Sequence, residues 1–437
     1  MRFFDRTEEI ASLKEILELS KGNAQFTVVT GRRRIGKTSL VWKAYEPILY
    51  FFVARKAESD LCTDYIQEIE NKLGIPTMGR VERFPKIFEY LMKLSIERPI
   101  TLFIDEFQEF FKVNKSVYSD MQRIWDMYHT KAHINLIVCG SIFSMMTKIF
   151  KDKKEPLYNR QTRFMSIKPF TPAVLKEIMA EYNPNYTAED LLALYSFTGG
   201  VAKYVQLLVD AGATTKTKML NHIIKADSVF LGEGKAILIE EFGKDYGVYF
   251  SILSAIARGK TLRSEIEQIV GREIGGYLTK LEKEYEVITK NQPIFEKSST
   301  KNVRYTIEDN FFTFWFRFIY KYNYMLEIEN FDAVKTIINR DYETFSGKML
   351  ERYFKRVLME SKAYTRIGSW WDRRGENEID IVAENELNDE AVFIEVKRKE
   401  DNFDAVALNE KVDVFTRATG KFKDYTVSQR GLSMTDM

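Results

Sequence analysis

The sequence has very few cysteines and histidines: two of the former, Cys62 and Cys139, and three of the latter. Two cysteines without a metal-site spacing exclude a disulfide framework and a cysteine-based zinc site, and they favour a reducing compartment. Three histidines also argue against histidine-based metal catalysis. We therefore predict a cytoplasmic protein without structural disulfides.

Long apolar runs are missing as well. A helix that crosses a bilayer needs about 20 consecutive, mostly apolar residues. The most hydrophobic stretch, residues 311–324, is interrupted by Arg317 and Lys321. The first six residues already carry charge and lack the apolar centre of a secretion signal. We expect no membrane partner, and we interpret residues 311–324 as an aromatic packing helix.

The net charge is close to zero, because 65 lysines and arginines nearly balance 63 aspartates and glutamates. The balance of +2 neither favours nor excludes a nucleic-acid partner, so local patches must decide. With 437 residues, of which 45% are hydrophobic, the chain is too long for a single core. Two or three packed domains are the expected range.

One stretch carries the clearest chemical signal. An apolar, β-branched run at residues 26–30 ends at Gly31, and four residues later Gly36-Lys37-Thr38 opens a helical pattern. This strand, loop and helix order is the context that a G-x-x-x-x-G-K-[ST] phosphate loop requires. The glycines let backbone N–H groups point at the β-phosphate, Lys37 would neutralise the β- and γ-phosphates, and Thr38 would bind Mg²⁺. The predicted nucleotide-contacting residues are Gly31, Arg32, Arg33, Arg34, Ile35, Gly36, Lys37, Thr38, Ser39 and Ser141. A plain glycine-rich turn is the alternative.

Two acidic residues follow the apolar strand predicted at 100–104. Asp105 would hold Mg²⁺ through water, and Glu106 would act as general base for the attacking water. Alone, such a pair is more often a solvated strand end, but beside a matched phosphate loop the catalytic interpretation is favoured. Ser141, at the end of the next strand, fits a γ-phosphate sensor and an ordinary polar strand end equally well. Arg160 is read either as an arginine finger or as a surface residue.

The middle of the chain changes character. Predicted strands alternate with helices over the first 170 residues, which indicates a doubly wound parallel sheet covered on both faces. From residue 171 to about residue 238 the pattern is helical. Three short helices and two strand-like pieces between 246 and 307 then predict a winged helix-turn-helix. Basic residues that could touch DNA phosphates are Arg272, Lys280 and Lys283 in the third helix and Lys297, Lys301 and Arg304 in the wing. Because glutamates dilute this face, a protein-contacting module stays open as the alternative.

The last third contains a subtler pattern. Two alternating segments, 377–382 and 392–397, are predicted to be neighbouring strands joined by a polar turn. Side by side they would bring Asp380, Glu395 and Lys397 to one edge, with Glu351 added from a helix at 344–359. Asp380 and Glu395 would bind a divalent metal that generates hydroxide, and Lys397 would orient the water or stabilise charge. A retained fold without cleavage is the alternative.

Several of these segments resemble a known family. The phosphate loop, residues 103–107, residues 138–141 and Tyr158-Asn159-Arg160 are similar to the archaeal-type ATPases of the AAA+/STAND superclass. Within that group the chain resembles members with a winged helix and a C-terminal PD-(D/E)XK nuclease-like domain, and the resemblance covers nearly its whole length. Such relatives usually carry a proline two positions after the glycine pair. Here Gly199-Gly200 is followed by Val201-Ala202.

The resemblance implies an α/β fold with a P-loop parallel-sheet ATPase core at 1–170, a helical lid at 171–240, a winged helix-turn-helix with the aromatic packing helix at 241–325, and a restriction-endonuclease-like αβ domain at 326–437. The predicted function is a Mg²⁺-dependent ATPase, with ATP and Mg²⁺ as cofactors, that binds DNA and cuts it with the help of a metal. The rival is an ATP-switched DNA- or protein-binding regulator of STAND type whose nuclease-like domain is silent. Either is compatible with a homo-oligomer.

Overall fold

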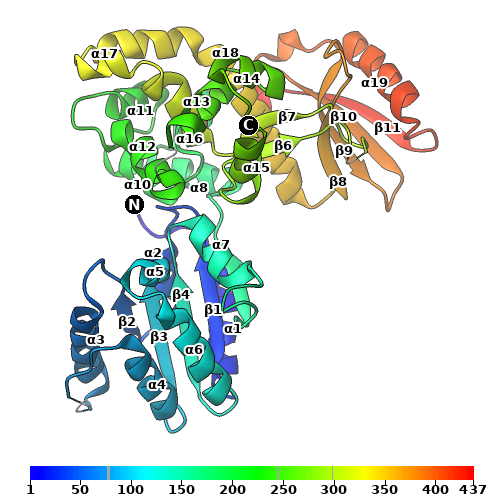
Figure 1. Ribbon diagram of the computed structural model, residues 1–437. Coiled ribbons are helices and arrows are strands. Elements are labelled where there is room, and N and C mark those ends of the chain that lie inside the picture. The colour runs from blue at the N-terminus through cyan, green and yellow to red at the C-terminus, as the bar shows by residue number, and fades with distance from the viewer. Residues whose placement is uncertain (76–78, 244–245, 298) are drawn as a thin grey trace. The chain divides into compact units, whose positions relative to one another are not determined.

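The computed structural model describes residues 1–75, 79–243, 246–297 and 299–437 (Figure 1). The chain divides into two compact units. Asp5–Lys168 form the core unit, and Met1–Phe4 together with Pro169–Met437 form the second unit. Within the described ranges, none of the helices combines the length and the apolarity that crossing a membrane requires.

A parallel sheet organises the core unit. Its strands are β1 (Gln25–Thr30), β2 (Leu49–Phe52), β3 (Ile100–Asp105), β4 (Ile134–Cys139) and β5 (Arg163–Ser166). They pair in the order β2-β3-β4-β1-β5, every neighbouring pair being parallel. All residues of β1 and β4 are buried, as expected for strands covered on both faces. The prediction of an α/β fold with a central parallel sheet is confirmed.

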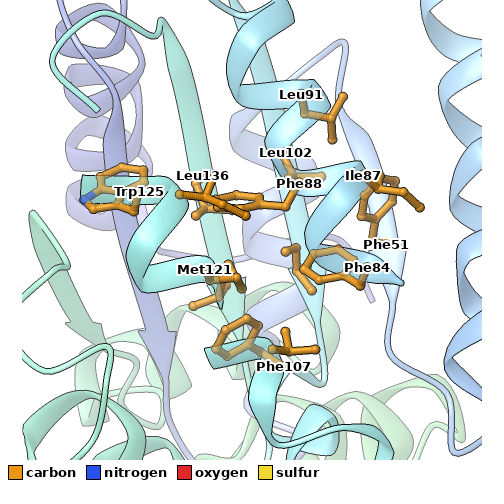
Figure 2. Close-up of a cluster of buried hydrophobic side chains, with 14 of the residues drawn as sticks. Phe51, Phe84, Ile87, Phe88, Leu91, Leu102, Phe107, Met121, Trp125 and Leu136 are labelled. Atoms are coloured by element: carbon orange, nitrogen blue, oxygen red, sulfur yellow. The ribbon is translucent and has the colours of Figure 1, made fainter. Parts of the chain in front are cut away.

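Helices cover both faces of this sheet. They are α1 (Thr7–Ser20), α2 (Lys37–Ala44), α3 (Glu58–Leu73), α4 (Phe84–Leu94), α5 (Phe110–Val113), α6 (Ser116–Tyr128) and α7 (Phe143–Lys151), with the 3-10 turn η1 (Phe107–Glu109). On one face α1 packs against β1, β4 and α2. On the other, α3, α4, α6 and α7 enclose a core in which Phe88, Leu102 and Leu136 are fully buried (Figure 2). Burying each such side chain contributes about 1.5–3 kcal/mol, which keeps the strand ends in fixed positions.

The second unit begins with helices: α8 (Pro172–Tyr182), α9 (Ala188–Thr198), α10 (Ala202–Asp210), α11 (Lys216–Ile223) and α12 (Val229–Phe242). Threonine side chains cap three of them by accepting backbone N–H bonds at the first turn. Gly199 and Gly200, with φ of 60° and 73°, turn the chain from α9 into α10. A Cβ atom at Gly200 would lie 2.4 Å from the carbonyl oxygen of Phe170, so this turn requires glycine.

Three short helices and a hairpin follow. They are α13 (Tyr246–Ala257), α14 (Arg263–Val270) and α15 (Gly275–Lys283), then the antiparallel strands β6 (Ile288–Asn291) and β7 (Arg304–Ile307). The element order therefore matches the one expected between residues 246 and 307. The aromatic stretch beyond it forms α16 (Asn310–Phe314), the π-helical turn η3 (Trp315–Tyr320) and α17 (Asn323–Glu327).

The aromatic stretch is a packing element, as predicted. Its phenylalanine rings are buried and contact side chains from four other helices. Ring centroids lie 4.4 Å apart for Phe311 and Tyr204 of α10, 4.7 Å for Phe314 and Phe197 of α9, 5.4 Å for Phe316 and Phe250 of α13, and 5.3 Å for Phe318 and Phe345 of the next helix. One short segment thus ties the helical part of the second unit to its C-terminal part.

The C-terminal part is built on a mixed sheet. Its elements are α18 (Phe331–Ser361), β8 (Arg366–Trp371), β9 (Glu378–Asn385), β10 (Glu390–Val396), α19 (Ala405–Thr419) and β11 (Thr426–Leu432), with the 3-10 turns η4 (Glu400–Asn402) and η5 (Met434–Asp436). The strand order is β11-β10-β9-β8, with β10 and β11 parallel and the other pairs antiparallel. Helix α19 covers one face through Leu408 and Phe415, which pack with Phe393 of β10.

The loop of the β6–β7 hairpin packs into this C-terminal core. Ile294 is 8% exposed and belongs to the same buried cluster as Phe393. Its backbone N–H donates to the carbonyl oxygen of Ser369 on the edge strand β8, at 2.9 Å. The ring of Phe295 lies 5.3 Å from that of Phe422. The described residues of the hairpin loop, 292–297 and 299–303, therefore cover one edge of the C-terminal sheet through Ile294 and Phe295.

Candidate functional site

The phosphate loop joins β1 to α2 in the geometry that its two glycines allow. Gly31 has φ of 142°, and a side chain there would come within 2.6 Å of the carbonyl oxygen of Ile167. Gly36, with φ of 94°, is the N-cap residue of α2. The loop therefore reaches the helix N-terminus, where backbone N–H groups and the helix dipole favour an anion.

Hydrogen bonds hold the side chains of Lys37 and Thr38 in place. The buried Lys37 Nζ donates to the carbonyl oxygens of Gly31 and Arg32, at 2.9 and 3.1 Å, so its charge lies inside the loop. The Thr38 hydroxyl donates to Asp105 Oδ2 at 2.9 Å. This contact joins the start of α2 to the end of β3. It brings together the Thr38 hydroxyl and the Asp105 carboxylate, the two groups that are expected to bind Mg²⁺.

Asp105 sits in a nearly closed environment. It is 6% exposed, and burial raises the pKa of its carboxyl group, an effect that the Thr38 hydrogen bond opposes. The hydroxyl of Tyr50, on β2, donates to the same oxygen at 3.3 Å. Sequence reasoning did not predict Tyr50, because only strand pairing brings residues so far apart in sequence together.

Glu106 lies directly beyond the end of β3, in a left-handed backbone conformation with φ of 54°. Its Oε2 accepts hydrogen bonds from the Ser141 hydroxyl, at 2.7 Å, and from the Gln108 amide, at 2.5 Å. Ser141 thus contacts the residue predicted to be the base. Gln108 was missed, since a glutamine two residues after an acidic pair has no pattern of its own.

A second group of charged residues lies at the edge between β9 and β10. Ile381 is opposite Ile394 in the antiparallel ladder, so the next step brings Asp380 opposite Glu395. Asp380 Oδ2 accepts a hydrogen bond from the backbone N–H of Val396 at 2.8 Å. Glu395 is buried, and its Oε2 has no hydrogen-bond partner among the described residues. A buried, unpaired carboxylate oxygen is unfavourable unless a cation or a proton joins it.

Lysines surround these carboxylates. Glu395 Oε1 lies 3.3 Å from Lys397 Nζ and 2.5 Å from Nζ of Lys411, which reaches over from α19. On α18, Glu351 pairs with Lys348 at 3.0 Å. Lys411 escaped the sequence analysis because its position on a separate helix carries no motif. The four residues predicted to meet here are thus accompanied by two further lysines.

The carboxylates influence each other electrostatically. Burial raises the pKa of Asp380 to about 7, and the charges of Glu351 and Glu395 add to this. Burial also raises the pKa of Glu351, while Lys348 opposes the shift. Within the part of the chain that the structure describes, no group of three or more His, Cys, Asp or Glu side chains has the arrangement of a metal site. Asp380 and Glu395 are the facing pair of this cluster.

Comparison with known proteins identifies the family. A model described as an ATPase domain predominantly from Archaea matches residues 3–208, and a model of archaeal and bacterial proteins of unknown function matches residues 315–413. An uncharacterised protein of Methanocaldococcus jannaschii is 32% identical over 415 residues, which cover 91% of this chain and 88% of the relative. The chain belongs to the archaeal-type ATPase family.

A solved structure has a similar fold. The Walker-type ATPase of Pyrococcus abyssi aligns with a TM-score of 0.53 and 21% identity, covering 72% of this chain and 96% of that one. As an archaeal-type ATPase the protein is an ATP hydrolase and binds nucleotide, which confirms the predicted class of enzyme. The phosphate loop and Asp105-Glu106 lie inside the matched region.

One prediction about this archaeal-type ATPase needs correction. Arg160 precedes β5, which pairs with β1 from Thr27 onward, so Arg160 lies beside the beginning of β1, whereas the phosphate loop follows its end. At about 3.3 Å per residue, the strand separates the two by roughly 20 Å. The guanidinium pairs with Asp126 on α6, with Nη2 3.0 Å from Oδ2. Arg160 therefore does not reach the phosphate loop of its own chain.

One basic residue of the predicted wing, Arg304 at the start of β7, contacts the C-terminal sheet. Arg304 Nη1 pairs with Glu378 Oε2 at 2.9 Å, and its Cζ lies 4.5 Å above the ring of Trp371. The Arg304 guanidinium is thus engaged with the C-terminal sheet. Lys297 and Lys301 are exposed, as are Lys280 and Lys283 on α15 and Arg272 in the turn that precedes it.

Proposed function

We propose that the archaeal-type ATPase site works with Mg²⁺ and that the loop residues and the end of β3 divide the chemistry between them. Lys37 would neutralise phosphate charge, Thr38 and Asp105 would hold Mg²⁺, and Glu106 would accept the proton of the attacking water. The 2.9 Å hydrogen bond between Thr38 and Asp105 carries this proposal, because it places a hydroxyl and a carboxylate together beside the phosphate loop. Bound Mg²⁺ would neutralise charge that develops on the phosphates.

The assignment is tested by nucleotide binding and turnover. Lys37→Ala should abolish the rise in melting temperature that Mg-ATP produces, whereas Glu106→Gln should keep this rise and lose turnover. Lys43→Ala is the matched control, because Lys43 lies on the same helix with its side chain exposed. Wild-type hydrolysis by Lys37→Ala would show that the site is elsewhere.

We further propose that the C-terminal part is a nuclease-like domain that cuts DNA with a divalent metal. The single observation behind this is that Asp380 and Glu395 come together one step beyond the Ile381–Ile394 pair, with one buried oxygen of Glu395 lacking a hydrogen-bond partner among the described residues. Two carboxylates of this kind fit a divalent cation that would complete its coordination with other oxygen donors. Lys397 would stabilise charge on the scissile phosphate, and Glu351 would support the pair from α18.

Charge on either side of this edge is consistent with a phosphodiester substrate. Arg373 and Arg374 are exposed in the β8–β9 turn, and Lys397 remains 36% exposed beside Glu395. We also propose that α13, α14, α15 and the hairpin form a winged helix. Its DNA contacts would come from the exposed lysines of α15 and from Lys297 and Lys301, which are exposed in the hairpin loop.

The cleavage experiment uses the full chain. Plasmid and single-stranded DNA are incubated with Mg²⁺ or Mn²⁺, with and without ATP. Asp380→Ala and Lys397→Ala should each remove cleavage and leave ATP hydrolysis intact. Lys399→Ala, an exposed lysine two residues further on, should cut as the wild type does.

A second candidate is an ATP-switched regulator that binds DNA or protein without cutting. The engagement of Arg304 by Glu378 and the two lysines already placed on Glu395 Oε1 favour it. Under this alternative no DNA form is cut with either metal, and Asp380→Ala binds DNA as tightly as the wild type. A homo-oligomer would be compatible with either function, and size-exclusion chromatography with and without ATP would detect it.

A further inference from the structure

Gln108 lies directly behind the residue proposed as the base. It belongs to the 3-10 turn η1, which begins one residue after Glu106, and its side chain is fully buried. Its Nε2 donates to Glu106 Oε2 at 2.5 Å, and the Ser141 hydroxyl donates to the same oxygen at 2.7 Å. One carboxylate oxygen of Glu106 is thus fixed by two donors from different elements.

The surrounding backbone is shaped for this amide. The left-handed conformation of Glu106 turns the chain sharply, so that the side chain two residues later folds back over it. Gly140 provides the space: a Cβ atom there would come within 2.4 Å of both Gln108 Oε1 and Met146 Sδ. Any larger residue at position 140 would displace the amide from its place against Glu106.

The other end of the amide is unsatisfied. Gln108 Oε1 is buried and accepts no hydrogen bond in the described structure. A hydrocarbon side chain of similar size would fill this interior position without burying an unpaired oxygen. The polar group is therefore explained by the hydrogen bond that its N–H makes to Glu106 rather than by packing.

We infer that Gln108 is a positioning residue for ATP hydrolysis: its amide fixes Oε2 of Glu106 so that Oε1 is the oxygen presented to the attacking water. This rests on the proposed role of Glu106. In the reaction, the water oxygen forms a bond to the γ-phosphorus, the bond from that phosphorus to the β–γ bridging oxygen breaks, and the water proton passes to Glu106. A base held in one orientation meets the water in the required geometry, which a freely rotating carboxylate would do only part of the time.

The test compares Gln108→Glu, Gln108→Leu and wild type in steady-state ATP hydrolysis. At about pH 8, both variants should lose roughly ten-fold in kcat with KM for Mg-ATP nearly unchanged. As the pH is lowered, Gln108→Glu should regain turnover relative to wild type, because a protonated carboxyl group can again donate to Glu106. Gln108→Leu cannot donate at any pH and should not recover. Gln67→Glu, on the exposed face of α3, is the matched control.

Gly140→Ala is an independent test of the same proposal, because it should displace the Gln108 amide without replacing it. It should lower kcat in the same way, and it decides the matter if either Gln108 variant fails to fold. Full turnover in Glu106→Gln would overturn the proposed base itself. If Glu106→Gln is inactive while the folded Gln108 and Gly140 variants keep wild-type kcat, the base stands and the positioning role of Gln108 is refuted.

Discussion

The Thr38 hydroxyl connects the beginning of α2, next to the phosphate loop, to the end of β3. Thr38 Oγ1 lies 2.9 Å from Asp105 Oδ2, and Tyr50 and the backbone N–H of Glu106 also donate to that carboxylate. The Thr38 hydroxyl can donate a hydrogen bond to Asp105 and can also offer its oxygen to a cation, and both functions need the hydroxyl group. The methyl group of Thr38 contributes neither function.

Thr38→Ala should therefore remove the Mg²⁺ dependence of ATP binding, because the ion loses one ligand and Asp105 loses one donor. We expect kcat/KM to fall by about ten-fold or more. Thr38→Ser is the matched control and should stay near wild type, since it keeps the hydroxyl. The measurement is ATP hydrolysis across a Mg²⁺ titration, and equal Mg²⁺ dependence in the alanine and serine variants would contradict this role.

Sequence reasoning located this site because Lys37-Thr38 and Asp105-Glu106 each belong to a short local pattern that follows an apolar strand. Lys37 and Thr38 begin α2 where the glycine pattern predicts, and Asp105 ends β3 as expected. Tyr50 and Lys411 were not predictable, since each reaches its partner only through tertiary packing. Arg160 was misplaced for the same reason: its sequence gives no sign of which sheet edge it occupies.

Elements with weak local patterns were the ones that the sequence did not reveal. The fifth core strand, β5, is short and only partly buried, and β11 is exposed along most of its length, so neither shows apolar alternation. Helix α18 runs over Phe331–Ser361, far longer than the predicted segment 344–359. The hairpin loop is the most informative case. In the sequence it looks like an ordinary turn between two strands, and the buried role of Ile294 becomes visible only in the packing against the C-terminal sheet.

Ile294→Ala should destabilise the C-terminal sheet, because it removes a side chain that is 8% exposed and packs in the Phe393 cluster. A loss of about 2–4 kcal/mol is expected. Hydrogen exchange of the β8 amides should become faster, while exchange in the core unit stays unchanged. Ile269→Ala, at a position that is 46% exposed on α14, is the control. Unchanged β8 protection in Ile294→Ala would mean that the loop is not part of this core.

Over the whole molecule, the family match and the packing divide the chain at different places. The ATPase model extends to residue 208, yet the core unit ends at Lys168. Helix α9 lies inside the matched region and packs against α16 and α18 of the second unit. Arg398, directly after Lys397, reaches Glu189 at the start of α9 with Nη2 2.6 Å from Oε2. A segment that the family assigns to the ATPase is thus held by the C-terminal part.

The ion pair between Arg398 and Glu189 should stabilise the packing of α9 against the C-terminal part, because its side chains are only 18% and 27% exposed. A double-mutant cycle of Glu189→Gln and Arg398→Gln, read from chemical unfolding of the second unit, should give about 1–2 kcal/mol. The exposed pair Lys260 and Glu265 is the control and should give less than about 0.5 kcal/mol. Equal coupling free energies in the two cycles would show that the Arg398–Glu189 pair stabilises the second unit no more than an exposed ion pair does.

The hairpin loop also restricts how this protein can change over evolution. A gene rearrangement that exchanged only the residues after α17 would bring in a foreign sheet whose edge has no place for Ile294, and would leave the old hairpin with an exposed apolar tip. The hairpin and the C-terminal sheet must therefore be inherited together. Among descendants of such a gene, substitutions at Ile294 should be accompanied by substitutions at Gly368, whose missing side chain makes room for it.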